Sequence, residues 1–75
     1  MADHELDLRG LNCPIPVMRM KKQMDKMSSG QTLRVLATDP GTLPDFKAYA
    51  KSSGNVLLES GETPERDFTF VLKKA

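Results

Sequence analysis

The sequence has little of what several common classes of small protein require. It contains no tryptophan, one tyrosine and three phenylalanines, so few large side chains are available to fill a core. No apolar run approaches the roughly 20 residues that a transmembrane helix needs, so we expect no membrane association. Eleven basic residues stand against ten acidic ones, for a formal net charge of +1. A dedicated nucleic-acid-binding domain is normally strongly basic, so this balance argues against one.

Cysteine is almost absent as well. The single cysteine, Cys13, cannot close an internal disulfide or build a cysteine-rich zinc site. A dithiol redox cycle within one chain and a small secreted scaffold held by disulfides are therefore both excluded. A lone thiol fits a reducing compartment, and the polar, acidic segment 1–5 does not resemble a secretory signal. We therefore expect a cytoplasmic protein with no metal site and no cofactor.

The length predicts one domain that spans residues 1–75. Residues 4–9 alternate between apolar and polar side chains and predict a half-buried strand. A helical pattern follows, because an apolar stripe recurs at spacings of three and four until Ser28-Ser29-Gly30 ends it. The residues of this stripe are Val17, Met20, Met24 and Met27.

The second half of the chain repeats this order and then adds a hairpin. Residues 32–38 predict a strand, residues 38–41 a turn, and residues 42–53 a second helix that ends at a left-handed Gly54. Residues 55–60 and 68–73 predict two more strands, joined by a hairpin connection over residues 61–65.

The predicted order is βαβαββ. A strand–helix–strand crossover is right-handed, so the first helix must pack on one face of the sheet. We therefore expect an α+β fold, a two-layer sandwich with a four-stranded mixed sheet and two helices on one of its faces. The other face of the sheet should be largely solvated.

Cys13 is the candidate reactive residue, because it lies in the loop between the first strand and the first helix. Gly10 is expected to permit a sharp turn there. Pro14 suits the first helical position, and with Pro16 it should stiffen the turn that aims the sulfur. Because a helix N-terminus favours an anion, we expect the pKa of the Cys13 thiol to lie below its ordinary value. A buried, inert cysteine is the alternative, but a loop of glycine, asparagine and prolines is a poor place for a core residue.

A cysteine–histidine hydrolase is not supported. His4 is the only histidine, and it lies at the opposite end of the first strand. An extended chain from His4 to Arg9 rises roughly 16 Å, so the imidazole should not reach Cys13 as a base. Asp7 and Asp45 could serve as acid–base carboxylates, but we assign Asp7 to the strand surface. Asp45 we assign to a helix cap, because it stands three residues after Thr42.

A basic stripe of three residues follows the first helix at spacings of three and four: Arg19, Lys22 and Lys26. The stripe is either a solvated face or a docking face for an acidic partner. Met18 falls off the apolar stripe near Cys13, so an exposed thioether there could contact partners as well. Direct binding of nucleic acid is not favoured, because no aromatic residue interleaves with these charges.

The residues around Cys13 carry a resemblance to a known family. The segment LDLRGLNCPIPV, residues 6–17, is similar to the signature of the TusA (SirA-like) sulfur carriers, with its Cys-Pro-x-Pro core and its preceding aspartate and glycine. Asp39-Pro40 followed by Asp45 also resembles that family, as do the length and the element order. The resemblance implies that Cys13 accepts sulfane sulfur as a persulfide and passes it to another protein.

The same resemblance implies the partners. Donors would be a cysteine desulfurase or a rhodanese-like protein, and acceptors would include a DsrE-type relay protein. The sulfur would end in thiolated tRNA, in cofactor synthesis or in sulfur oxidation. We therefore expect a sulfurtransferase-type carrier that does not turn over alone. The alternatives are a non-enzymatic regulatory or interaction module and a thiol redox sensor of the same fold.

Overall fold

The computed structural model describes residues 3–75. Met1 and Ala2 lie outside the described residues; they belong to segment 1–5, which we do not expect to be a secretory signal. The elements are β1 (His4–Leu8), α1 (Ile15–Asp25), β2 (Thr32–Ala37), α2 (Thr42–Ser53), β3 (Val56–Glu62) and β4 (Phe68–Lys73). The predicted βαβαββ order is confirmed. The main differences are that α1 ends at Asp25, before Met27, and that β3 continues through Gly61 to Glu62.

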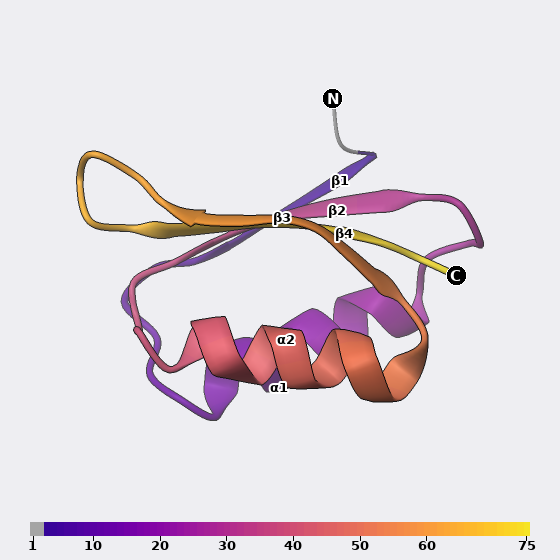
Figure 1. Ribbon diagram of the computed structural model, residues 1–75, viewed down its shortest axis with the longest axis horizontal. Helices are drawn as coiled ribbons and strands as arrows, with labels where there is room; N and C mark the ends of the chain where they lie inside the picture. Colours follow the sequence, from indigo (N-terminus) through magenta and orange to yellow (C-terminus); the bar gives the residue numbers. More distant parts are fainter. Residues whose placement is uncertain (1–2) are drawn as a thin grey trace.

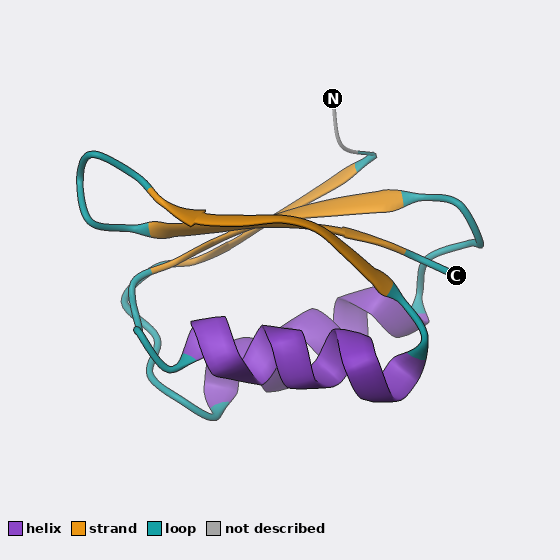
Figure 2. Ribbon diagram, in the orientation of Figure 1, coloured by secondary structure: helices purple, strands orange, loops and turns teal. Residues whose placement is uncertain are grey.

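The four strands form one mixed sheet in the order β1-β2-β4-β3. β1 and β2 run parallel, whereas β4 pairs antiparallel with β2 on one side and with β3 on the other. Both helices cover the same face of this sheet, with α1 and α2 side by side beneath it (Figures 1 and 2). The predicted two-layer α+β sandwich is therefore confirmed.

The core lies between the sheet and the two helices. Alternate residues of the central strands point into it, and Val35 and Phe70, which are register partners, are fully buried. The ring of Phe46 from α2 lies 4.4 Å from the ring of Phe70, centroid to centroid. The methionine stripe of α1 closes the core from the other helix, because Met20 and Met24 are fully buried. Each such side chain contributes about 1.5–3 kcal/mol through burial, which gives a short chain a stable centre.

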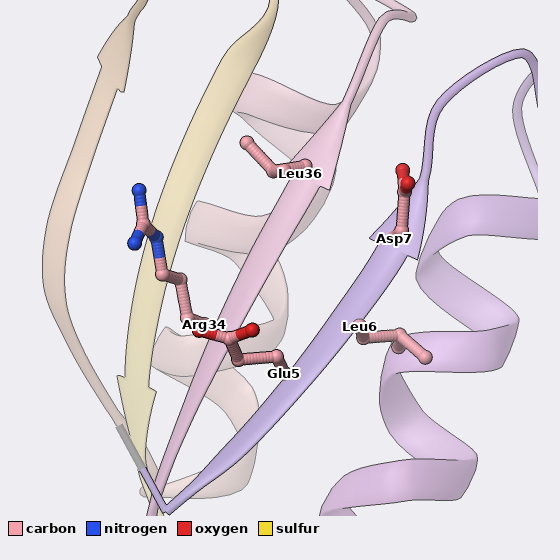
Figure 3. Close-up of a pocket in the computed structure, with 5 residues that line it drawn as sticks. All are labelled: Glu5, Leu6, Asp7, Arg34 and Leu36. Carbon is pink, nitrogen blue, oxygen red and sulfur yellow. The ribbon is translucent and has the colours of Figure 1, made fainter. Parts of the chain in front are cut away.

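The other face of the sheet is open, as predicted. Figure 3 shows Glu5, Asp7 and Arg34 on this open face, whereas Leu6 points toward α1. Asp7 lies at the sheet surface as expected, where its carboxylate accepts a hydrogen bond from the Arg9 guanidinium at 2.7 Å. The hydrogen bonds from Arg9 lower the pKa of Asp7 to about 2.

The ends of α2 are fixed in different ways. Gly54 ends the helix in the left-handed conformation, with φ of 82°, as predicted. The predicted capping box at the start is wrong, because Gly41 is the N-cap residue and makes no side-chain cap bond. The Thr42 hydroxyl instead donates a hydrogen bond to the carbonyl of Asp39 at 2.7 Å, and the Asp45 carboxylate accepts one from the side chain of Cys13.

Neither helix of residues 3–75 is long and apolar enough to cross a membrane.

Candidate functional site

The site forms where two parallel strands end at the same edge of the sheet. Because β1 and β2 are parallel, the loops that follow them leave the sheet together and lead into the two helices (Figure 1). Two hydrogen bonds join these loops. The backbone N–H of Gly10 donates to the Thr38 hydroxyl at 2.9 Å, and the backbone N–H of Cys13 donates to the Asp39 carboxylate. The loop that carries Cys13 is therefore held against the loop after β2.

Gly10 makes the turn that starts this loop. Its φ is 85°, in the left-handed region that residues with a side chain rarely adopt, and no atom beyond the two adjoining residues lies within 4 Å of where a Cβ would be. The next residue, Leu11, donates its N–H to the carbonyl of Leu8 at 3.3 Å, which closes the turn. The prediction of a sharp turn at Gly10 is confirmed.

The start of α1 differs by one residue from the prediction. The carbonyl of Pro14 accepts the first helical hydrogen bond, from the N–H of Met18 at 3.1 Å, so Pro14 is the N-cap residue and Ile15 is the first helical one. Pro16 occupies the second helical position, where it lacks an N–H that would find no partner in the helix anyway, and it is buried. Cys13 stands next to the N-cap, as expected, and the Cys13–Pro14 peptide bond is cis.

The Cys13 thiol is exposed, and it donates a hydrogen bond to a carboxylate. Its Sγ lies 3.0 Å from Oδ2 of Asp45, in the first turn of α2. This hydrogen bond raises the pKa of the Cys13 thiol, and so do partial desolvation and the negative charges of Asp45 and Asp39. The predicted low pKa is therefore wrong. That prediction considered only the N-terminus of the helix that follows Cys13, whereas a second helix brings a carboxylate to the sulfur.

Asp39 organises the same corner from the loop side. Its carboxylate accepts the backbone N–H of Cys13 through Oδ2 and that of Gly41 through Oδ1, the latter at 3.2 Å. The position of a Cβ on Gly41 would lie 3.6 Å from the Cβ of Cys13, so the two loops are in close contact there. Asp39 thus holds the backbone of the thiol residue, while Asp45 holds its sulfur.

A groove runs from Cys13 between the two helices. Its volume is about 320 Å³, and its lining residues are Cys13, Pro14, Val17, Lys21, Asp45, Ala48, Tyr49 and Ser52. The Lys21 ammonium lies over the ring of Tyr49, 5.9 Å from the centroid. Sequence reasoning missed Lys21, although its spacing of four from Val17 and seven from Pro14 puts all three on one helix face.

The residues predicted for partner contact lie on a different face of α1. Met18 is 61% exposed, and its neighbour Ile15 is 44% exposed. Together with Arg19 and Lys22 they line a shallow depression of about 370 Å³. Lys26 is exposed too, but it is the C-cap residue of α1 rather than part of the helix. The structure therefore joins Met18 to the basic stripe, and Ile15 and Pro14 connect this surface to Cys13 along the chain.

The remaining candidates stay apart from the thiol. His4 lies at the start of β1, whereas Cys13 follows the end of that strand, and the imidazole Nε2 lies 3.2 Å from the side-chain oxygen of Gln31. Within residues 3–75, no group of three or more histidine, cysteine, aspartate or glutamate side chains could hold a metal ion.

The fold and the site together define a small α+β protein that presents one exposed thiol beside the start of a helix. Its sequence matches the model of the family described as "Sulfurtransferase TusA" over residues 4–74. The chain therefore belongs to the TusA family of sulfur carriers.

Individual relatives agree with this assignment. The chain is 55% identical over 73 residues to the sulfur carrier protein TusA of Allochromatium vinosum, and the match covers 97% of this chain and 95% of that one. It is 42% identical over 73 residues to a putative sulfur carrier protein of Neisseria meningitidis, with 97% of each chain covered. The crystal structure of a SirA-like protein from Desulfitobacterium hafniense has the same fold, with a TM-score of 0.82 at 24% identity over 93% of this chain and 95% of that one.

Proposed function

We propose that Cys13 is the residue on which this sulfur carrier bears its cargo. The exposure of the Cys13 sulfur at the end of the groove between α1 and α2 carries this proposal. Since the chain has no second cysteine, no other thiol could bear a persulfide.

The transfer itself needs no cofactor and no net oxidation. Cys13 Sγ attacks the outer sulfur of a persulfide on a donor protein, and the bond between the two sulfurs of the donor breaks. The electron pair of that bond leaves with the donor's cysteine sulfur, which takes up a proton to become a thiol. Cys13 Sγ gives up its thiol proton in this step, and the transferred outer sulfur keeps the proton or the negative charge that it had on the donor. Unloading repeats the same exchange with the thiol of an acceptor protein.

The donor and the acceptor are proposed from the family. A cysteine desulfurase or a rhodanese-like protein would supply the sulfur, and a DsrE-type or similar protein would receive it, in the cytoplasm. Such partners need a surface to recognise beside the thiol. We assign this role to Met18 and the basic stripe. Met18, Arg19 and Lys22 line one depression beside the helix that follows Cys13, and Lys26 lines the adjacent one with Arg19 and Lys22.

Sulfur loading followed by transfer tests the proposal. Incubation with a cysteine desulfurase and cysteine should add one sulfur to the protein, which a reductant removes, and a desalted loaded sample should pass that sulfur to a DsrE-type acceptor. Cys13→Ser should do neither. Full function of the Cys13→Ser variant in cells would indicate an interaction module, and a disulfide-linked dimer that forms on oxidation without sulfur loading would indicate a redox sensor.

A further inference from the structure

The contact between Cys13 and Asp45 has a consequence for the loaded protein, and it rests on the proposed function. Three charged groups lie at Cys13 or line the groove beside it: Asp45 from α2 at the sulfur, Asp39 from the loop after β2 at the backbone N–H, and Lys21 from α1 in the groove. Of these, Asp45 contacts the sulfur directly, at 3.0 Å. A carboxylate accepts hydrogen bonds and donates none, so this contact requires a proton on the sulfur.

A persulfide changes that requirement. The outer sulfur of a persulfide is more acidic than an ordinary thiol, and its anion has no proton to donate. The sulfur that bears the cargo keeps no proton either, because it is bonded to carbon and to sulfur. After loading, the contact with Asp45 thus loses its donor and places an anion beside a carboxylate, where like charges repel.

We propose that Asp45 is a positioning residue that holds the unloaded Cys13 thiol in its neutral form and releases the sulfur once it carries a persulfide. The empty carrier then keeps a protected thiol with low reactivity. The loaded carrier turns its outer sulfur away from Asp45 toward solvent, where an acceptor can reach it. The contact with Asp45 is thus present in the empty carrier and absent in the loaded one, so the reactivity of the sulfur differs between the two states without a second binding site.

The geometry of the site supports this division of roles. Asp45 reaches the sulfur from a helix that packs beside α1, whereas Asp39 is occupied by the backbone N–H groups of Cys13 and Gly41. Removal of the Asp45 charge should therefore change the chemistry of the sulfur and leave the loop in place. The hydrogen bond from the thiol to Asp45 also raises the pKa of Cys13, as a contact that favours the neutral form must.

Alkylation of both states by iodoacetamide, followed by intact mass, tests the proposal on the full chain. The loaded state is prepared with inorganic polysulfide: the thiol of Cys13 and a polysulfide dianion give the Cys13 persulfide anion and a protonated polysulfide shorter by one sulfur. Asp45→Asn should alkylate on the order of fivefold faster than wild type as a thiol at pH 7, as expected for the loss of one exposed charge-assisted hydrogen bond. The pH midpoint of that reaction should fall. The persulfide rate should change by less than about twofold.

Two variants serve as controls, and thermal unfolding verifies that every variant folds. Asp25→Asn, at the far end of α1, matches the change in net charge and should react like wild type. Asp39→Asn removes a carboxylate that does not touch the sulfur, and it should have a smaller effect than Asp45→Asn. The proposal is overturned if Asp45→Asn leaves the thiol rate unchanged, if it speeds thiol and persulfide equally, or if Asp39→Asn has the larger effect. Failure of wild type to take sulfur from a cysteine desulfurase would refute the proposed function instead, since the thiol measurements need no sulfur loading.

Discussion

Gly10 offers a sharp test of how the loop of Cys13 is built. Its φ of 85° is one that an L-residue with a Cβ adopts at a cost of roughly 1–2 kcal/mol. Because no atom beyond the two adjoining residues lies within 4 Å of the position of a Cβ, Gly10→Ala adds no clash with the rest of the fold, and the cost is that of the local backbone alone. A chain of 75 residues is expected to be stable by about 4–11 kcal/mol, so the variant should fold with a measurable loss.

Urea unfolding followed by far-UV circular dichroism measures this loss. With a slope of about 1 kcal/mol per molar urea, as small domains have, the midpoint should fall by about 1–2 M at an unchanged slope. Gly10→Asn should lose less, because asparagine enters the left-handed region more readily than alanine. Gly61→Ala is the matched control: Gly61 also has no atom within 4 Å of a Cβ, but it lies in β3 without a positive φ. Its stability should change by no more than about 0.5–1 kcal/mol, and toward higher stability.

The reasoning would be refuted if Gly10→Ala and Gly61→Ala had equal unfolding midpoints, or if Gly10→Asn were the least stable of the three. A change in slope would mean that the compactness of one state had changed instead.

Two further predictions concern the surface of the protein. Replacement of the three residues of the basic stripe by glutamate should slow sulfur loading from an acidic donor, most strongly at low salt, because charged groups at the rim of an interface mainly set the association rate. Met18→Asp should weaken the complex with the donor at all salt concentrations, because apolar contacts mainly set the dissociation rate. Stopped-flow loading rates against salt measure both effects, and wild-type rates in both variants would place the docking surface elsewhere. The Asp7 carboxyl should titrate by NMR near 2 rather than 3.8, and Arg9→Ala should return it toward 3.8. Since the pKa is lower in the folded state, the contribution of Asp7 to stability is present above a pH of about 4 and is lost as the pH falls through about 2.

Most of the fold followed from local patterns. The alternation in the strands, the buried Met20 and Met24 of α1 and the glycine at the end of α2 are each determined by neighbours in the sequence, and these predictions are confirmed. Met27 is buried too, but it lies beyond the end of α1. The extension of β3 was missed because Gly61 signals a turn locally. In the structure its strand pairs with β4 instead, through Gly61↔Thr69 and Glu62↔Phe68.

The candidate site was predictable in position but not in the contacts of its thiol. Its loop, Cys13 and Gly10 were visible in the sequence. The partner of the thiol was not, since Asp45 lies 32 residues away and its spacing from Thr42 indicated a cap. Only the packing of α2 beside α1 brings that carboxylate to the sulfur, and the same packing creates the groove lined by Lys21. The local sequence pattern therefore predicts a thiolate, whereas the tertiary contacts of Cys13 favour a thiol.

The central claim is that Cys13 carries sulfur, and one measurement tests it most directly. Wild type and Cys13→Ser are each incubated with a cysteine desulfurase and cysteine, alkylated, digested and analysed by peptide mass spectrometry. The account predicts one added sulfur on the wild-type peptide that contains Cys13, removable by reductant, and no added sulfur anywhere in the Cys13→Ser variant. Sulfur on any other residue, or equal loading of the two proteins, would contradict it.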